Sequence, residues 1–450
     1  MSEPLSRARM RELLGTRRIE HVVVLGANGT MGYGSGALFA RSAARVTFLA
    51  RTRDKAAEGL ARAVKQVRSP AIAERVALGS YDADLERAVA EADLVFEAVA
   101  EDPAVKRPLF ERIDAARRPD AIVSTVTSGL SINQLGEGRS ASFRRHFLGL
   151  HFFNPPNVIA GTELVPGRET DAALTDFVEA YATLELGRVT VRTEDTPGFA
   201  GNRVGFKVLN EAAGLALEHG PMLTDRLIGP YTGRALAPLA TIDLVGWDVH
   251  AAIVDNVFAN TDDEAHAALA LPAFMRELIG KGVLGRKSGG GFFKRDAEKR
   301  KLVLEPKTGD YTLASEVTLP ALPFIERVSE RHRYGDYRGA LAELARAEGE
   351  YARLAKRVLA GYVSYALHRV GEVTRSLREL DLIMGFGFNW APPGVLIDAF
   401  GASVMADLME ASGVPVPAAL ERARRGEAPR FYDDRATGIG RFFVAAPAAS

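Results

Sequence analysis

The chain has 450 residues, which is too long for a single hydrophobic core, so we expect two or three domains. It carries 57 Lys and Arg against 57 Asp and Glu, and this balance excludes a net field that would draw the whole molecule to nucleic acid or to an anionic membrane surface. It has no cysteine, which excludes disulfides, thiolate metal sites and a cysteine nucleophile and favours a cytoplasmic location.

The N-terminal residues 1–18 are basic and partly amphipathic, and we expect them to form a surface helix ahead of the first domain. They lack the continuous apolar core of a secretory signal. A cleaved organelle-targeting segment is the alternative, although Glu3 and Glu12 are unusual in such sequences. No run of about 18 apolar residues occurs in the chain, so the sequence predicts no membrane span.

Residues 19–194 have the pattern of an α/β domain. An apolar run, a glycine cluster, a helical stretch and a second apolar run follow one another between residues 19 and 50, and this order is typical of a βαβ unit. Further strands are expected at 93–98, 121–125 and 147–151, separated by helix-length segments such as 103–115. The alternation predicts a Rossmann-type dinucleotide-binding domain with a parallel, doubly wound sheet.

After residue 195 the sequence predicts helices at 202–218, 235–246 and 249–258, and no strands. The segment 237–246, APLATIDLVG, is repeated as PPGVLIDAFG at 392–401, with Pro, Ile, Asp and Gly at matching places. We therefore expect all-α C-terminal domains that arose by internal duplication. The predicted boundaries are a helical domain at 195–295, a charged linker at 296–344 and a second helical repeat at 345–450.

The glycine cluster follows the first predicted strand and precedes a helix, where glycines let the backbone close on a pyrophosphate at the helix N-terminus. Its spacing is GxxGxxG, as though Asn28 had been inserted into the usual GxGxxG fingerprint. A glycine turn needed only for tight packing is the alternative. The expected cofactor-binding residues of this loop are Gly26, Asn28, Gly29, Thr30, Met31 and Gly32.

The end of the second strand should carry an acid that binds the adenosine ribose of NAD, but Ala50 stands there, followed by Arg51 and Arg53. Two arginines suit the 2′-phosphate of NADP, so the sequence predicts NAD or NADP as the cofactor. The alternative is that both arginines are solvated loop charges.

Four segments together resemble the 3-hydroxyacyl-CoA dehydrogenase family: STVTSGLSI at 124–132, GLHFFNP at 149–155, DTPGFAGNR at 195–203 and LGRKSGGGFF at 284–293. The resemblance covers residues 19–295 and extends to the second helical repeat, which is similar to the duplicated C-terminal domain of the family. It implies a nicotinamide-dependent oxidoreductase of fatty-acid β-oxidation that interconverts 3-hydroxyacyl-CoA and 3-oxoacyl-CoA. No enoyl-CoA hydratase domain, as some members carry, is expected in this chain.

His151 matches the catalytic histidine of the family. Oxidation of a secondary alcohol needs a base near the hydroxyl, and histidine suits that task near neutral pH. The resemblance implies that Glu163 orients the imidazole and that Ser128 and Asn202 contact the reacting oxygen. Taken singly, these four residues are equally typical of structural, capping or surface positions.

This sequence departs from the family at Val126, where an asparagine is usual, and at Gly129, where a second serine is usual. Glu101 and Lys106 resemble positions near the nicotinamide, although a charged helix start also explains them. The other histidines lack metal-ligand spacing, so no metal site is expected.

The expected partner is an acyl-CoA thioester, and no binding of nucleic acid is expected. The chain is expected to be a monomer or a homodimer. Two other functions stay open: a dehydrogenase of a free 3-hydroxy acid, and a non-catalytic nicotinamide-binding protein.

Overall fold

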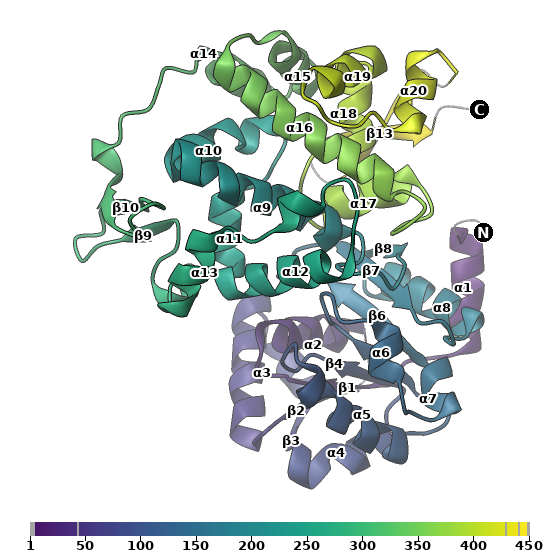
Figure 1. Ribbon diagram of the computed structural model, residues 1–450. Helices are drawn as coiled ribbons and strands as arrows, with labels where there is room; N and C mark the ends of the chain where they lie inside the picture. Colours follow the sequence, from purple (N-terminus) through teal and green to yellow (C-terminus); the bar gives the residue numbers. More distant parts are fainter. Residues whose placement is uncertain (1–4, 43–44, 428–429, 440–441, 448–450) are drawn as a thin grey trace. The chain divides into compact units, whose positions relative to one another are not determined.

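Figure 1 shows the computed structural model of the chain, which describes residues 5–42, 45–427, 430–439 and 442–447. The chain divides into two compact units, one formed by residues 1–200 with 372–375 and the other by the remaining residues. No helix in the described ranges is both long enough and apolar enough to cross a membrane. The domain boundaries expected near residues 18, 194, 295 and 344 stay predictions.

The first unit is built on an eight-stranded sheet with the strand order β3-β2-β1-β4-β5-β6-β7-β8. Its strands are β1 His21–Leu25, β2 Arg45–Ala50, β3 Val76–Ser80, β4 Leu94–Glu97, β5 Ile122–Thr125, β6 Phe147–Phe152, β7 Gly161–Pro166 and β8 Val189–Arg192. Strands β1 to β6 are parallel, while β7 runs antiparallel to β6. The Rossmann-type fold class is confirmed, and the antiparallel β7 is an addition that periodicity did not predict.

Both faces of this sheet are covered. Successive side chains of a strand point to opposite faces, and both sets are buried here. Val22 and Val24 of β1 belong to one buried cluster, and Val23 and Leu25 belong to the other. The helices of the unit are α1 Arg7–Thr16, α2 Thr30–Ser42, α3 Arg53–Val67, α4 Tyr81–Ala90, α5 Pro103–Ala116, α6 Ile132–Gly136, α7 Ala141–Arg145 and α8 Ala172–Ala180. A 3-10 turn at Pro70–Arg75 and a π-helical turn at Tyr181–Glu185 complete it.

The N-terminal helix α1 has one buried face. Met10 and Leu13 are each 8% exposed and pack with Ala180 and Leu184. The surface helix expected from the sequence is therefore present, and it contributes to the core of the first unit.

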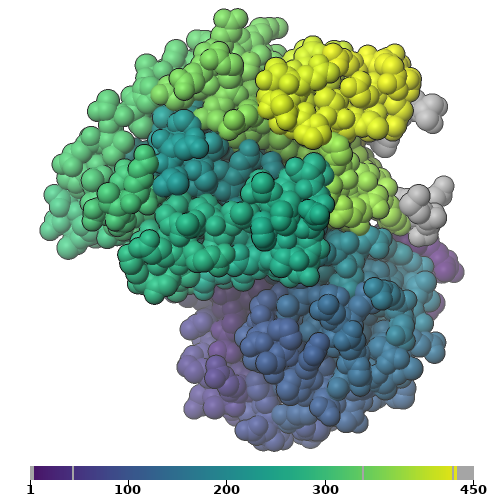
Figure 2. Space-filling view, viewed as in Figure 1, coloured from purple at the N-terminus to yellow at the C-terminus, as the bar shows by residue number. Residues whose placement is uncertain are grey.

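The second unit is mainly helical. Its helices are α9 Gly201–His219, α10 Pro221–Leu227, α11 Pro238–Val245, α12 Trp247–Asn260, α13 Ala273–Gly280, α14 Pro323–Arg333, α15 Tyr337–Arg346, α16 Glu350–Arg369, α17 Leu377–Phe386, α18 Pro393–Phe400, α19 Ala402–Ala411 and α20 Ala418–Arg424. Short 3-10 turns lie at Pro230–Thr232, His266–Leu269, Arg286–Ser288 and Ala314–Glu316. In Figure 2 the last helices, in yellow, lie against the green segment that contains α16, in agreement with the contacts of α16 with α18 and α19.

The expectation of no strands after residue 195 is wrong. Strands β9 Phe293–Arg295, β10 Lys301–Leu304 and β11 Tyr311–Leu313 form a small antiparallel sheet, and β12 Tyr432–Ile439 pairs with β13 Phe442–Pro447. The strands β9 to β11 span only three or four residues each, which is too short for an alternating pattern to be recognised in the sequence.

The two helical repeats share a hydrogen-bond pattern as well as a sequence pattern. Asp243 near the end of α11 accepts hydrogen bonds of 2.9 Å from the backbone N–H groups of residues 292–293. Asp398 near the end of α18 accepts bonds of 2.8 Å from residues 431–432. A glycine with positive φ ends each helix. These matching contacts confirm the internal duplication.

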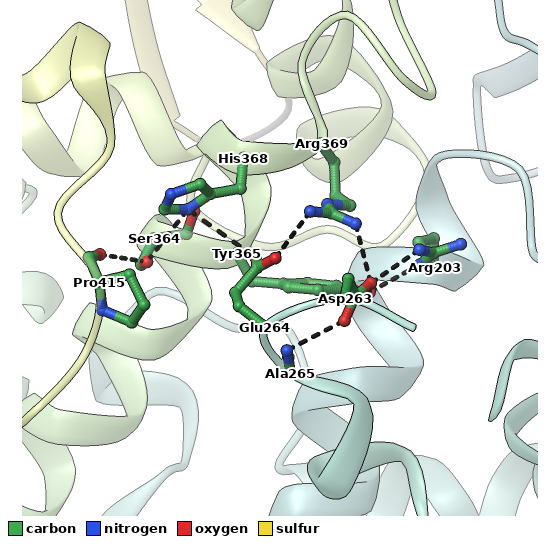
Figure 3. A network of polar contacts seen from close by, with 9 residues as sticks. All are labelled: Arg203, Asp263, Glu264, Ala265, Ser364, Tyr365, His368, Arg369 and Pro415. Atoms are coloured by element: carbon green, nitrogen blue, oxygen red, sulfur yellow. Dashed lines mark hydrogen bonds and ion pairs between the residues drawn. The ribbon is translucent and has the colours of Figure 1, made fainter. Parts of the chain in front are cut away.

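A buried polar network joins the repeats within the second unit (Figure 3). Asp263 accepts hydrogen bonds from Arg203 of α9 at 2.7 Å, and from Tyr365 and Arg369 of α16 at 2.9 and 2.8 Å. Burial opposes ionisation of Asp263, but the hydrogen bonds from Arg203 and Tyr365 outweigh it and hold its pKa below the usual value. The second repeat thus supplies partners to charged groups of the first.

Candidate active site

The glycine loop lies where β1 ends, between β2 and β4, which is the place where open α/β sheets bind their ligands. Gly26 has φ of 74°, and a Cβ there would lie 2.2 Å from the carbonyl oxygen of Ala98. A Cβ on Gly32 would lie 2.1 Å from the oxygen of Gly26. Only glycine fits at these two positions, so the backbone closes tightly before α2 begins at Thr30.

Tyr81, at the start of α4, holds this loop and was missed in the sequence. The backbone N–H of Gly26 donates a 2.8 Å hydrogen bond to its hydroxyl oxygen. Burial raises the pKa of Tyr81 to about 12, so the hydroxyl stays protonated near neutral pH. No local sequence pattern links Tyr81 to a loop 55 residues earlier.

The end of β2 carries positive charge and no acid. Ala50 is buried, while Arg51 and Arg53 are exposed on either side of Thr52, whose hydroxyl caps α3 by accepting from Lys55 N–H at 3.2 Å. Among the described residues, neither arginine forms an ion pair. Both guanidinium groups therefore remain available to an anion beside the glycine loop.

His151 and Glu163 face one another on neighbouring strands. They are directly opposite in the antiparallel register of β6 and β7, and residues 153–160 form the connection between these strands. His151 Nδ1 lies 2.6 Å from Glu163 Oε2. The residues are 4% and 0% exposed, and we assign the Nδ1–H donor from this distance. The predicted pair is thus within hydrogen-bonding distance in a buried setting.

Three further residues fix the position of this pair. The N–H of Ala200 donates a 3.0 Å hydrogen bond to Glu163 Oε1. The rings of Phe153 and Phe199 lie with their centroids 5.0 and 5.9 Å from that of His151. Phe199 has φ of 50°, an uncommon value for a residue other than glycine, and such strain is often found at functional sites.

A buried ion pair lies at the end of β4. Lys106 Nζ is 2.8 and 2.9 Å from the two carboxylate oxygens of Glu97, and both side chains are fully buried. Thr125 and the N–H of Val99 also donate to Glu97, at 2.6 and 2.7 Å. Glu97 was missed, although an acid inside an apolar predicted strand is a usable signal. Lys106 is fully buried, and its expected contact with the cofactor stays a prediction.

Glu101 connects this ion pair to the loop that carries Ser128. Its Oε1 accepts hydrogen bonds of 2.6 Å from the Thr127 hydroxyl and from the Ser128 N–H, and its Oε2 lies 3.4 Å from Lys106 Nζ. The Glu101 side chain is 43% exposed, so it also reaches the surface. Glu101 and Ser128, expected at the nicotinamide and at the substrate, are therefore neighbours.

Asp195 anchors the next turn of the same loop. Its carboxylate accepts from the Ser131 hydroxyl at 2.7 Å and from the backbone N–H groups of Ile132 and Asn133 at 2.8 and 2.9 Å. The segment DTPGFAGNR thus begins on a residue that shapes the loop carrying Ser128, a role that the resemblance alone did not assign.

The remaining predicted residues lie where their segments were expected. Asn28, Gly29, Thr30 and Met31 form the turn and first residues of α2, and Val126 is buried at the end of β5 beside Gly129 in the loop. Asn202 is 5% exposed in the first turn of α9, in the second unit, and its expected place near the reacting oxygen stays a prediction. In the described part of the chain, no three His, Asp or Glu side chains are arranged to hold a metal ion.

Comparisons with known proteins agree with this architecture. Residues 21–196 match the family described as 3-hydroxyacyl-CoA dehydrogenase, NAD binding domain, and residues 198–295 match the C-terminal domain of that family. A probable 3-hydroxyacyl-CoA dehydrogenase of Bacillus subtilis is 32% identical over 75% of this chain, which spans only 42% of that relative's length. The 3-hydroxybutyryl-CoA dehydrogenase of Mycobacterium tuberculosis is 32% identical over 61% of this chain and 98% of its own.

A solved structure shares the fold over most of the length. The 3-hydroxybutyryl-CoA dehydrogenase of Escherichia coli K12 has a TM-score of 0.63 at 21% identity, over 91% of this chain and 96% of that one.

Proposed function

Because the chain belongs to the 3-hydroxyacyl-CoA dehydrogenase family, we propose that it interconverts 3-hydroxyacyl-CoA and 3-oxoacyl-CoA with a nicotinamide cofactor, in fatty-acid oxidation. The observation that carries this proposal is the buried His151–Glu163 pair, at 2.6 Å. A base held by a carboxylate, at the carboxyl edge of a dinucleotide-binding sheet, is what the oxidation of an alcohol by hydride removal requires. We expect the protein to be located in the cytoplasm, because a chain without cysteine fits a reducing compartment.

The residues of the chain fit the cofactor, since Gly26 and Gly32 let β1 turn tightly into α2, whose N-terminus would hold the pyrophosphate. A nicotinamide cofactor held at this glycine loop would supply the acceptor for the hydride from the carbon that bears the hydroxyl. His151 holds its Nδ1–H on Glu163, so Nε2 takes the hydroxyl proton, and the Glu163 carboxylate stabilises the imidazolium that forms. Ser128 donates to the oxygen as it becomes a carbonyl, from a loop that Glu101 fixes.

The first test is the initial rate of acetoacetyl-CoA reduction, followed by nicotinamide absorbance. Acetoacetate and acetoacetyl-pantetheine are compared under the same conditions, because binding energy from the remote nucleotide part of the substrate is used at the reacting centre. We expect turnover of the CoA thioester and much lower kcat/KM for both shorter substrates. Equal kcat/KM for acetoacetate would instead establish a dehydrogenase of free 3-hydroxy acids, and cofactor binding without turnover of any substrate would establish a non-catalytic protein.

The exposed arginines after β2 predict that NADPH is used at least as well as NADH. Replacing Arg51 and Arg53 together by Ala should lower kcat/KM for NADPH by about 10- to 100-fold, because charge-assisted hydrogen bonds to a 2′-phosphate contribute about 1.5–3 kcal/mol. The kcat/KM for NADH should change by less than about threefold. The control is Lys55→Ala, since Lys55 lies on the same helix and is paired with Glu58. A wild-type enzyme that strongly prefers NADH contradicts this assignment.

We further propose that the protein is active as a monomer. The two helical repeats of one chain already contact each other inside the second unit. An isolated antiparallel backbone bridge pairs Arg234 with Trp390, and the polar network around Asp263 also links the repeats.

A further inference from the structure

The second unit contains a cavity of about 700 Å³ with a strongly basic lining. It lies among α10, the start of α11, the turn that follows Gly285 and the strands β9 and β10. Five of its eleven lining residues are basic, namely Arg226, Arg286, Lys294, Arg295 and Lys301, and Asp225 is the only acid among them. The volume is within the range of small-molecule sites, about 300–1,000 Å³.

Four of the five basic residues have no carboxylate partner. In the part of the chain that the structure describes, Arg286, Lys294, Arg295 and Lys301 form no ion pair. Other basic residues nearby are paired: Lys287 with Asp248, Arg276 with Asp255, Lys281 with Glu277, and Arg300 with Asp296. Positive charge is thus concentrated around this cavity without a direct ion pair to these four side chains, and a bound anion would reduce their mutual repulsion.

Aromatic rings hold two of these cations without neutralising them. Lys294 Nζ lies 3.6 Å from the centroid of the Tyr311 ring, and Lys301 Nζ lies 4.3 Å from that of Phe293. Cation–π contacts of this kind fix an ammonium group while its charge stays available to a ligand. The lysines are therefore ordered at the wall of the cavity before any ligand binds.

The internal duplication provides a comparison within the chain. Asp225 accepts a 2.7 Å hydrogen bond from the N–H of Leu239, the second residue of α11. Asp381 accepts a 3.1 Å bond from the N–H of Gly394, the second residue of α18. The two aspartates are equivalent, so the cavity of the first repeat has a counterpart in the second.

Beside Asp381 the second repeat has an aromatic ring and an apolar side chain. The Tyr432 hydroxyl donates to Asp381, and the Tyr432 ring packs against Leu382, which directly follows Asp381. In the first repeat the residue after Asp225 is Arg226, and the residue at the place of Tyr432 is Phe293, which has no hydroxyl. The two repeats thus differ directly beside their equivalent aspartates, so the shared fold alone does not fix the basic lining of the cavity.

We propose that this cavity binds the oligophosphate group of a nucleotide or of a nucleotide-containing coenzyme. Arginine guanidinium groups form paired hydrogen bonds with phosphate oxygens, and lysines add point charges, so four cations without an ion pair match a diphosphate better than a single carboxylate. The proposal does not depend on the dehydrogenase activity, because it concerns binding to residues of the second unit alone.

The test is isothermal titration of the full chain with pyrophosphate, ADP and coenzyme A, each in the presence of saturating NADH so that the dinucleotide site is filled. We expect one site for pyrophosphate, and a loss of at least about tenfold in affinity when Arg286→Ala and Lys301→Ala are combined. The matched control combines Lys299→Ala and Arg300→Ala, which removes the same charge from the same hairpin outside the cavity. Affinity in this control should stay within about twofold of wild type.

A second variant, Arg226→Leu, copies the residue of the second repeat and should also weaken binding. Tighter binding of ADP than of pyrophosphate identifies a free nucleotide as the ligand, and tighter binding of coenzyme A that the double variant loses identifies the coenzyme. Absence of pyrophosphate binding, or binding that both cavity variants leave unchanged while they melt at the wild-type temperature, overturns the proposal. These outcomes are independent of turnover and can be read in a His151→Gln background.

Discussion

His151→Gln should lower kcat for acetoacetyl-CoA reduction by about 10²- to 10⁴-fold, the usual contribution of a positioned general acid or base. Glutamine keeps a hydrogen-bonding side chain of similar reach but cannot carry the proton. Because His151 is 4% exposed, replacement by a polar side chain of similar size should preserve the fold. The loss should appear in kcat, and the dissociation constant of the nicotinamide cofactor should stay within about twofold, since the residue acts at the reacting oxygen.

The matched control is His146→Gln, at the opposite end of β6, where the imidazole Nδ1 lies 2.9 Å from the Ser142 carbonyl oxygen. That variant should keep the wild-type kcat. Glu163→Gln should lower kcat by a smaller factor than His151→Gln, because the histidine that carries the proton remains. This variant loses only the carboxylate that fixes the tautomer of His151 and stabilises its imidazolium form. Unchanged kcat in His151→Gln would assign the proton transfer to another group.

Lys106→Met should destabilise the first unit by about 3–5 kcal/mol, the effect of leaving one partner of a buried ion pair uncompensated. Lys106 and Glu97 are both fully buried, and methionine leaves the carboxylate without its cation. Denaturant unfolding of wild type and variant, followed by circular dichroism, measures the difference. A fall in kcat should accompany it, because Glu101, which fixes the Ser128 loop, also loses its neighbour Lys106.

The double variant Glu97→Gln with Lys106→Met should recover part of the lost stability, since it removes the charge that Lys106→Met leaves behind. The exposed pair of Lys55 and Glu58 serves as the comparison, and Lys55→Met should have little effect on stability because water already solvates both charges. Equal effects of Lys106→Met and Lys55→Met would contradict the role given to the buried pair.

Local pattern determined much of the architecture. Strands β1, β4, β5 and β6 are fully buried in a largely parallel sheet, and β2 is buried from its second residue onward. Such strands stand out in the sequence as continuous apolar segments. The glycine loop was also predictable, because Gly26 and Gly32 occupy positions that only a residue without Cβ can fill. The duplication followed from the matching segments around Asp243 and Asp398.

Elements with short or mixed patterns were not predictable. Strands β9 to β11 are too short for a period to emerge, and β7 became a strand because it pairs with β6. The polar anchors Glu97, Tyr81 and Asp195 act on residues far along the chain, so no local spacing reveals their partners.

The sequence by itself determined the fold class, the duplicated helical region and the glycine loop, because each depends on the order of residues along one strand, turn or helix. The candidates His151 and Glu163 followed from the resemblance of their segments to the family. Only the tertiary structure decided that these two side chains lie 2.6 Å apart, that Lys106 is buried against Glu97, and that basic side chains from α10, β9 and β10 line one cavity. Those features depend on which strands pair and which side chains fill a shared space, and both are set by packing across distant segments.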